Sequence, residues 1–255
     1  MKILAIGDLV GNTGVNYLKN NLSKIKRENN IDFIIANVEN AADGMGITQK
    51  VYNELRYLDI DVMTLGNHTW SKKDVFTLLD NKNLLRPANF YDNVAGVGYN
   101  IYEFNNKKIA VINLIGRVYI DNPSNNPFAI IDKILKEIEN QADIIAVDFH
   151  AEATAEKIAM AYYIKDRATI LFGTHTHVQT ADEKILDGMG YITDLGMTGP
   201  SISVLGLRVD IALKRFVTGL PERYKVSDEG VMFNGCIFEI DDETCKCISI
   251  NRLNY

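Results

Sequence analysis

The chain has 255 residues, 47% hydrophobic and 24% charged, so it can bury a substantial core and fits one large domain better than two small ones. Its net charge of −6 and pI of about 5.3 argue against a broad basic surface for duplex nucleic acid. No stretch approaches the ~20 apolar residues of a membrane helix, and the start lacks a signal-peptide pattern. We therefore expect a single domain over residues 1–255, located in the cytoplasm, with no membrane partner.

The first two thirds of the chain alternate short apolar runs with longer amphipathic stretches, which is typical of an α/β fold. In the first hundred residues, strands are expected at Ile3–Ile6, Phe33–Ala36 and Val62–Leu65. Helices are expected at Val15–Glu28 and Thr48–Leu58. A further helix is predicted after Ser71, which would cap it, with Asp74 three residues later.

The next elements begin with a hairpin, because Tyr99–Phe104 and Ile109–Leu114 flank the turn residues Asn105-Asn106-Lys107. Later helices are expected at Phe128–Ile138 and Glu152–Lys165, and later strands at Ile144–Val147 and Thr169–Phe172. A second hairpin is expected near the end, where an acidic turn separates Gly230–Ile240 from Thr244–Ile250. The layout predicts an α/β fold with mixed sheets and helices outside.

All four histidines lie in short polar motifs, and two acidic motifs precede them. The motifs are Gly7-Asp8, Asn37-Val38-Glu39-Asn40, Gly66-Asn67-His68, Asp148-Phe149-His150 and Gly173-Thr174-His175-Thr176-His177. Most of them follow a predicted strand directly. In α/β sheets, ligands gather at the carboxyl ends of the strands, so we expect these segments to deliver their side chains to one crevice.

The residue types in these motifs suit a pair of metal ions. Glu39 can bridge both ions with its two oxygens, Asp8 suits one of them, and Asn67 offers a neutral carbonyl oxygen. Imidazole nitrogens come from His150, His175 and His177. This oxygen-rich set contains no thiolate, so it favours iron, manganese or zinc in a reactive site over a closed structural zinc site.

Taken alone, each residue also has an ordinary structural interpretation. Asp8 could cap a helix or form a turn, Glu39 could be a solvated loop carboxylate, and His150 could be a hydrogen-bonded core histidine. His175 and His177 are stronger evidence, since a spacing of two in an extended segment points both rings to one side. The order of the motifs along the chain is more specific than any single motif.

Gly173, which precedes the last two histidines, allows the backbone to approach a neighbour closely. With it, the ordered motifs resemble those of the calcineurin-like metallophosphoesterases over residues 1–200. Two departures stand out: the usual histidine two residues beyond Asp8 is missing, and Glu39 stands where most members have Asp. With the runs Gly11-Asn12-Thr13-Gly14 and Gly196-Met197-Thr198-Gly199-Pro200, these departures resemble the YmdB-like branch of bacterial phosphodiesterases associated with 2′,3′-cyclic nucleotides.

The resemblance implies a four-layer α/β/β/α sandwich, the calcineurin-like metallophosphoesterase fold. It implies two metal ions, iron or manganese in its place, with Glu39 shared between them. The implied ligands are Asp8, Glu39, Asn40, Asn67, His150, His175 and His177. For Asn40 there is an alternative, because beside Glu39 it can turn toward a neighbouring polar group instead. A homo-oligomer is suggested by the resemblance alone.

His68 follows Asn67 directly, so it would lie beside the metals without having to bind them. We expect it to be the general acid that protonates the leaving sugar oxygen, in agreement with the family's pattern; the alternatives are packing or phosphate binding. The predicted function is hydrolysis of a small phosphodiester, a cyclic nucleotide of the 2′,3′-cyclic AMP type, by metal-activated hydroxide. The alternatives are a phosphomonoesterase or RNA nuclease on the same site, or a regulatory or scaffold protein with a residual metal site.

Overall fold

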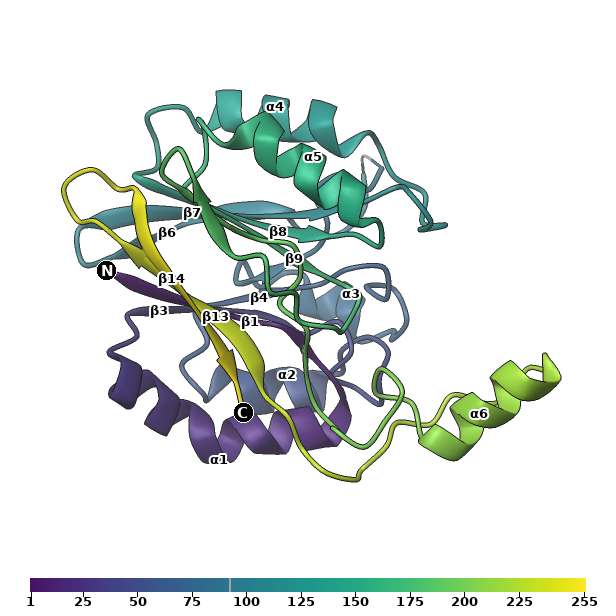
Figure 1. The fold of residues 1–255 in the computed structure, drawn as a ribbon. Coiled ribbons are helices and arrows are strands. Elements are labelled where there is room, and N and C mark those ends of the chain that lie inside the picture. The colour runs from purple at the N-terminus through teal and green to yellow at the C-terminus, as the bar shows by residue number, and fades with distance from the viewer. Residues whose placement is uncertain (92) are drawn as a thin grey trace.

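The computed structural model describes residues 1–91 and 93–255, which form two packed sheets with helices outside (Figure 1). The first sheet has the order β14 (Cys247–Asn254), β13 (Asn234–Ile240), β1 (Lys2–Ile6), β3 (Phe33–Asn37), β4 (Val62–Thr64) and β5 (Leu84–Leu85). The second has the order β10 (Lys184–Leu186), β11 (Met189–Ile192), β9 (Ile170–Thr174), β8 (Ile144–His150), β7 (Lys107–Ile115) and β6 (Tyr99–Phe104). A separate two-stranded sheet pairs β2 (Asp8–Leu9) with β12 (Met197–Thr198) in parallel.

Helices cover the outer face of each sheet (Figure 1). The first sheet is covered by α1 (Gly11–Asn29) and α2 (Gln49–Arg56), and the second by α4 (Pro127–Glu137) and α5 (Thr154–Ile164). The remaining helices are α3 (Val75–Leu78) and α6 (Val209–Thr218). The four-layer α/β/β/α sandwich expected from the sequence is confirmed.

Alternation along the strands explains the layers. In β1, Ile3 and Ala5 belong to the core between the two sheets, whereas Leu4 and Ile6 belong to the core under α1 and α2. A central strand that is buried on both faces has to be apolar throughout, as β1 is. A third apolar core lies between the second sheet and the helices α4 and α5.

Most predicted elements are confirmed, with bounds shifted by a few residues. The helix expected over Thr48–Leu58 is α2, and Thr48 is its N-cap, because its side chain accepts a hydrogen bond from the Val51 backbone N–H at 3.4 Å. The predicted start of the helix after Ser71 is wrong. Residues 71–74 form turns, α3 begins at Val75, and the Asp74 carboxylate accepts from the Gln49 backbone N–H at 2.8 Å instead of capping its own helix.

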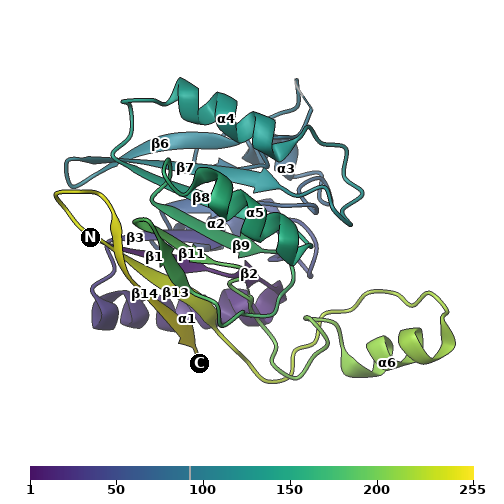
Figure 2. The same cartoon turned by 45° about the horizontal axis from the view of Figure 1, so that its top comes forward.

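Residues 178–229 carried no predicted element, and the structure places β10, β11, β12 and α6 there. Residues 200–231 leave the sandwich after a bridge between Gly199 and Met232, whose backbone groups exchange hydrogen bonds of 3.0 and 2.8 Å. We call this the projecting segment. Its helix α6 stands away from both sheets (Figure 2). None of the described helices is both long enough and apolar enough to span a bilayer.

The strands that matter for the site are parallel. In the first sheet β1, β3 and β4 run in one direction, and in the second β7, β8 and β9 do so. The polar motifs identified in the sequence follow or end β1, β3, β4, β8 and β9. The fold therefore carries them to the carboxyl ends of strands from both sheets, as the sequence predicted.

Candidate metal centre

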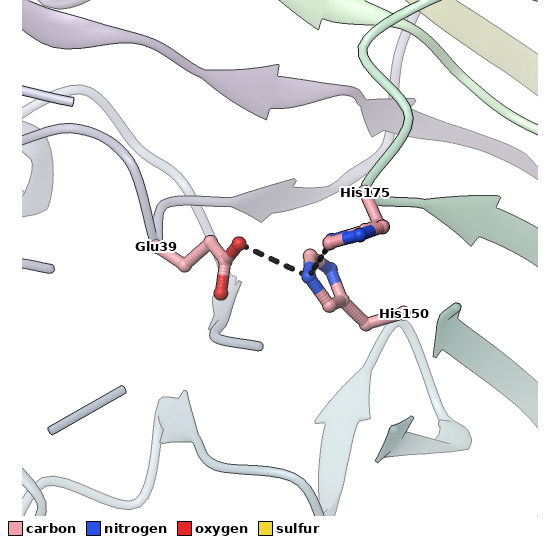
Figure 3. Close-up of side chains that lie close together, drawn as sticks. All are labelled: Glu39, His150 and His175. Carbon is pink, nitrogen blue, oxygen red and sulfur yellow. Dashed lines mark hydrogen bonds and ion pairs between the residues drawn. The ribbon is translucent and has the colours of Figure 1, made fainter. Parts of the chain in front are cut away.

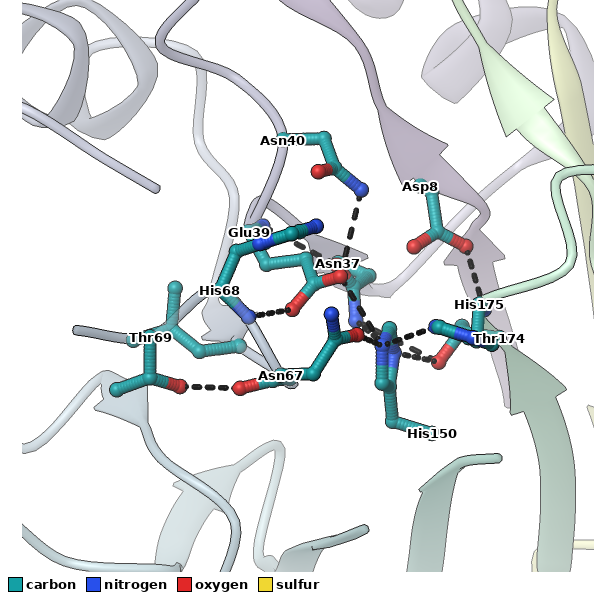
Figure 4. A network of polar contacts seen from close by, with 12 residues as sticks. Asp8, Asn37, Glu39, Asn40, Asn67, His68, Thr69, His150, Thr174 and His175 are labelled. Carbon is teal, nitrogen blue, oxygen red and sulfur yellow. Dashed lines mark hydrogen bonds and ion pairs between the residues drawn. The ribbon is translucent and has the colours of Figure 1, made fainter. Parts of the chain in front are cut away.

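The candidate ligands meet at these strand ends (Figure 4). Around His150, the donor atoms of Glu39, His150 and His175 all lie within 4.8 Å of one another (Figure 3). His150 Nε2 is 3.0 Å from Glu39 Oε1, 2.8 Å from Asn67 Oδ1 and 3.0 Å from His175 Nδ1. Glu39 and His150 are fully buried, so water does not separate these groups.

The protons on the two rings can be assigned from their other contacts. The Thr174 hydroxyl donates to Asp148 Oδ1 at 2.7 Å, so its lone pair is left to accept from His150 Nδ1 at 2.9 Å. His175 Nε2 lies 2.9 Å from Glu152 Oε2, which requires a proton on that nitrogen. His175 then turns an unprotonated nitrogen toward the centre, and His150 does so in its neutral form.

The centre is thus an assembly of acceptors. With His150 in its neutral form, the two ring nitrogens, Glu39 Oε1 and Asn67 Oδ1 would all present lone pairs to one another at hydrogen-bond distance. Buried acceptors that face each other are costly unless a proton or a cation lies among them. The residues present therefore fit a metal ion at this place, with nitrogen and oxygen donors of the kinds that zinc, iron and manganese accept.

Charges in this cluster follow from burial and from the Glu39–His150 pair. Burial works against the charged form of Glu39, but the His150 ring outweighs it and lowers the pKa of Glu39 to about 2. Burial likewise works against charged His150, but Glu39 outweighs it and raises the pKa of His150 to about 9. Burial, and then charged His150, lower the pKa of His175 to about 3. The metal-free cluster thus retains a proton on His150, in the position that a cation would take over.

A second group forms on the other side of Glu39. His177 Nδ1 donates to the carbonyl oxygen of Leu205 at 3.1 Å, which leaves Nε2 unprotonated. This nitrogen lies 3.1 Å from Asn40 Nδ2 and 3.8 Å from Asp8 Oδ1. Asn40 Nδ2 also lies 3.4 Å from Glu39 Oε1, so Glu39 touches both groups.

Asp8 supplies a separate test of whether a cation fits. Its Oδ2 accepts from the His175 backbone N–H at 3.0 Å, but its buried Oδ1 has no hydrogen-bond partner among the described residues. Burial raises the pKa of Asp8, against the opposing effect of His177. A buried carboxylate oxygen that points at an unprotonated imidazole nitrogen is what a metal ion would satisfy.

Gly66 provides the space that this geometry needs. A Cβ atom on Gly66 would lie 2.4 Å from both Glu39 Oε2 and His150 Nε2. No side chain fits there unless the two candidate ligands move. The glycine of the Gly-Asn-His motif is therefore a steric requirement of the site, which the sequence motif alone does not explain.

The glycines of two other motifs allow backbones to approach. A Cβ atom on Gly7 would lie 2.1 Å from the carbonyl oxygen of Gly196, the same oxygen that accepts from the Asp8 backbone N–H at 3.0 Å. A Cβ atom on Gly173 would lie 1.9 Å from the carbonyl oxygen of Thr193, which confirms the close approach predicted there. The Gly196–Pro200 run thus holds Asp8 in place through its backbone.

One sequence expectation needs correction. His175 and His177 do not lie in an extended segment, because β9 ends at Thr174 and both histidines have positive φ, 98° and 64°. They reach different groups, since a tight turn separates the two rings. Asn40 presents its amide nitrogen to His177, so it would bind a metal only after its amide turns over. The other candidate ligands lie together, and their role as ligands stays a prediction.

Sequence reasoning missed the residues that orient His150. Asp148 is fully buried and accepts from Thr174 at 2.7 Å, from Thr64 at 2.5 Å and from Asn37 at 3.3 Å. Burial raises the pKa of Asp148 to about 6, against these hydrogen bonds and charged His150. A signal was available, because Asp148 and His150 are two residues apart on a strand and so share one face.

His68 lies at the mouth of the site. Its backbone N–H donates to Glu39 Oε2 at 3.0 Å, and its side chain lines a pocket of about 330 Å³ together with His175 and His177. Glu152, which the sequence analysis did not select, lines the same pocket. His68 is therefore positioned by one candidate ligand and open to the space where a substrate would bind.

Comparison with known proteins agrees with this geometry. The family model described as YmdB-like protein matches residues 4–253. A Bacillus subtilis protein named 2′,3′-cyclic-nucleotide 2′-phosphodiesterase is 44% identical over 99% of this chain and 96% of its own length.

Two solved structures are similar over the whole chain. One is a crystal structure of a novel phosphatase from Mycoplasma pneumoniae, with 37% identity, a TM-score of 0.95, and coverage of 100% of this chain and 93% of that one. The other is a hypothetical protein from Thermus thermophilus, with 35% identity, a TM-score of 0.94, and coverage of 100% and 99%.

Proposed function

The chain belongs to the YmdB-like protein family of calcineurin-like metallophosphoesterases, and from that premise we propose that it is a metal-dependent phosphodiesterase that hydrolyses 2′,3′-cyclic nucleotides. The name of the Bacillus subtilis relative supports the reaction and the substrate class. Support from the chain itself comes from the convergence of nitrogen and oxygen donor atoms at the carboxyl ends of five strands. That convergence is the observation that carries the proposal.

We propose that the chain holds two metal ions, iron or manganese in its place. Asn67, His150 and His175 would hold one ion, and Asp8, Asn40 and His177 the other. Glu39 would be shared, because its Oε1 already lies near both groups. When bound, such ions lower the pKa of a water molecule toward neutrality and neutralise charge on the phosphate.

The chain's own residues supply the remaining steps. Glu39 accepts from the His68 backbone N–H through Oε2, and its Oε1 faces the ligand groups. Glu39 therefore holds the proposed acid at a fixed position relative to the metal site. His68, on the pocket wall, would give a proton to the sugar oxygen that leaves phosphorus. Asp148 and Thr174 hold a proton of His150 on Nδ1, so Nε2 is the nitrogen that would bind a metal.

The test is a side-by-side assay of 2′,3′-cyclic AMP, a phosphomonoester and single-stranded RNA, with metal counted per chain. We expect the cyclic nucleotide to be the preferred substrate, with activity lost on chelation and restored by iron or manganese. Preference for the monoester or for RNA would replace the substrate class with one of the alternatives. Wild-type protein that hydrolyses none of the three when loaded with metal would support a regulatory or scaffold role instead.

We also propose that the chain forms a homo-oligomer through α6. The side chains of Phe216 and Val217 are 78% and 83% exposed, Leu213 is also exposed on this helix, and Leu220 is exposed just beyond its end. Exposed apolar patches on a projecting element mark interaction surfaces. Antiparallel pairing of two copies would set the acidic first turn of α6 against its basic last turn.

A further inference from the structure

The catalytic pocket has one apolar wall, and the projecting segment builds most of it. Of the described residues that line the pocket, the side chains of Met45, Leu205 and Tyr224 are apolar or aromatic, whereas the others are polar or glycine. Tyr224 carries the only aromatic ring in that lining apart from the histidines. Metal ions held by the candidate ligands would bind a phosphate group, and this wall lines the same pocket.

The Tyr224 ring is held by two glycines with positive φ. A Cβ atom on Gly44 would lie 2.6 Å from Tyr224 Cε1, and one on Gly206 would lie 3.5 Å from the Tyr224 hydroxyl oxygen. The φ values are 80° for Gly44 and 91° for Gly206. The ring therefore lies against two loops, and at Gly44 a side chain would collide with it.

The same wall is tied to the metal site. Leu205, next to Gly206, accepts the hydrogen bond from His177 Nδ1 at 3.1 Å. On the other side, Gly44 precedes Met45, and the Gly44 backbone N–H donates to the Asn40 carbonyl oxygen at 3.1 Å. Tyr224 thus lies between two loops that each hold a candidate ligand, which fixes the distance from the phosphate position to the ring.

A larger cavity of about 940 Å³ lies beyond the ring. It shares Met45 and Tyr224 with the catalytic pocket, and it is otherwise lined largely by polar and charged side chains such as Asn12, Lys72 and Ser227. Tyr224 therefore stands where the two spaces adjoin.

We propose that Tyr224 is the nucleobase-binding residue of this enzyme, on which the base of the cyclic nucleotide stacks while the phosphate lies at the metal centre. The proposal rests on the proposed function and adds the residue that makes the enzyme prefer a nucleotide to other cyclic phosphodiesters. A base offers a π-face whatever its identity, so stacking selects a nucleotide over a base-free ester without choosing among bases. Met45 and Leu205 complete the apolar surface around the ring.

The experiment compares two substrates with the same reacting group, 2′,3′-cyclic AMP and methyl riboside 2,3-cyclic phosphate, which has no base. In the metal-loaded wild type we expect the nucleotide to have the higher kcat/KM. Tyr224→Leu should reduce that preference by about 5- to 150-fold, the factor that corresponds to ~1–3 kcal/mol of base stacking. The loss should appear in the KM of the nucleotide, and Tyr224→Phe, which keeps the ring, should restore it.

The controls separate the ways in which the idea can fail. Tyr57→Leu, at a tyrosine that is 87% exposed, should leave both substrates unchanged. If Tyr224→Leu lowers kcat/KM equally for both substrates, Tyr224 only anchors the projecting segment and base binding is refuted. If the metal-loaded wild type hydrolyses both substrates equally well, base recognition is also refuted, although the phosphodiesterase stands. If it hydrolyses neither, the proposed function itself falls, and this inference with it.

Discussion

The metal centre and the projecting segment are built in opposite ways. At the metal centre, side chains from distant parts of both sheets are buried, and the polar groups around His150 constrain one another. In the projecting segment, α6 buries only Ala212 among its described residues and exposes a series of large apolar side chains. Figures 1 and 2 show the contrast, since every other long helix lies flat on a sheet.

The contrast suggests a division of roles, in which the sheets carry the reacting groups and the projecting segment determines which molecules bind. The sheets hold the groups that any phosphoester needs, and strand ends position such groups more rigidly than loops do. The projecting segment contributes the Leu205 carbonyl to His177, the Tyr224 ring to the pocket and an apolar helix to solvent. We therefore expect changes at the centre to abolish activity and changes in the segment to alter what is bound.

The largest effect should come from Glu39→Gln, which removes the charge that faces His150. Loss of one partner from a buried pair costs ~3–5 kcal/mol, so we expect metal affinity and kcat/KM to fall by about 10³-fold. Metal content by elemental analysis and steady-state kinetics measure this. Glu103→Gln, at an exposed carboxylate on β6, is the matched control. Two ions per chain in Glu39→Gln would show that Glu39 is not shared.

His68→Ala should lower kcat by ~10²–10⁴-fold, the usual contribution of a positioned acid, while the metal content stays at the wild-type level. The reason is that His68 contacts Glu39 through its backbone, which the substitution keeps. Kinetics with a substrate whose leaving group needs no proton should show a much smaller loss. Unchanged turnover of the cyclic nucleotide would rule out His68 as the acid.

Asp148→Asn should weaken metal binding by ~10–100-fold, the usual cost of disturbing a residue that orients a ligand. The new amide would donate to Thr174 rather than accept from it, so the Thr174 hydroxyl would donate to His150 Nδ1 and the ring proton would move to Nε2, facing the metal site. Calorimetric titration of the metal-free protein with Mn²⁺ measures the affinity. Asp166→Asn, at an exposed aspartate, is the control, and equal affinities would remove Asp148 from this role.

The smallest effect on the folded chain is expected in α6. Phe216→Ser with Val217→Ser should change the free energy of unfolding by less than ~0.5 kcal/mol, because both side chains are exposed in the single chain. Light scattering should nevertheless show that the double variant dissociates toward single chains, whereas the wild type stays assembled. An assembly of unchanged mass would mean that α6 is not the interface and would weaken the contrast between the two regions.

Much of the sandwich could be predicted because its strands and helices have recognisable spacings of apolar residues in the local sequence. The apolar run of β1 and the helical spacing of Leu18, Leu22 and Ile25 in α1 each follow from burial of one or two faces. The segment after Ser71 was mispredicted because the Asp74 carboxylate is used by a different helix, α2. A capping pattern in sequence cannot tell which helix start will use the carboxylate.

By itself, the sequence determined the layers, the strand ends and the set of polar side chains that gather there, because alternation and helical spacing are properties of adjacent residues. Only the tertiary structure decided which ring nitrogen carries a proton, which oxygen of Asp8 is left without a partner, and that Tyr224 lies beside residues 44 and 206. Those facts depend on groups far apart in the chain, whose distances are fixed only when the two sheets and the projecting segment pack together.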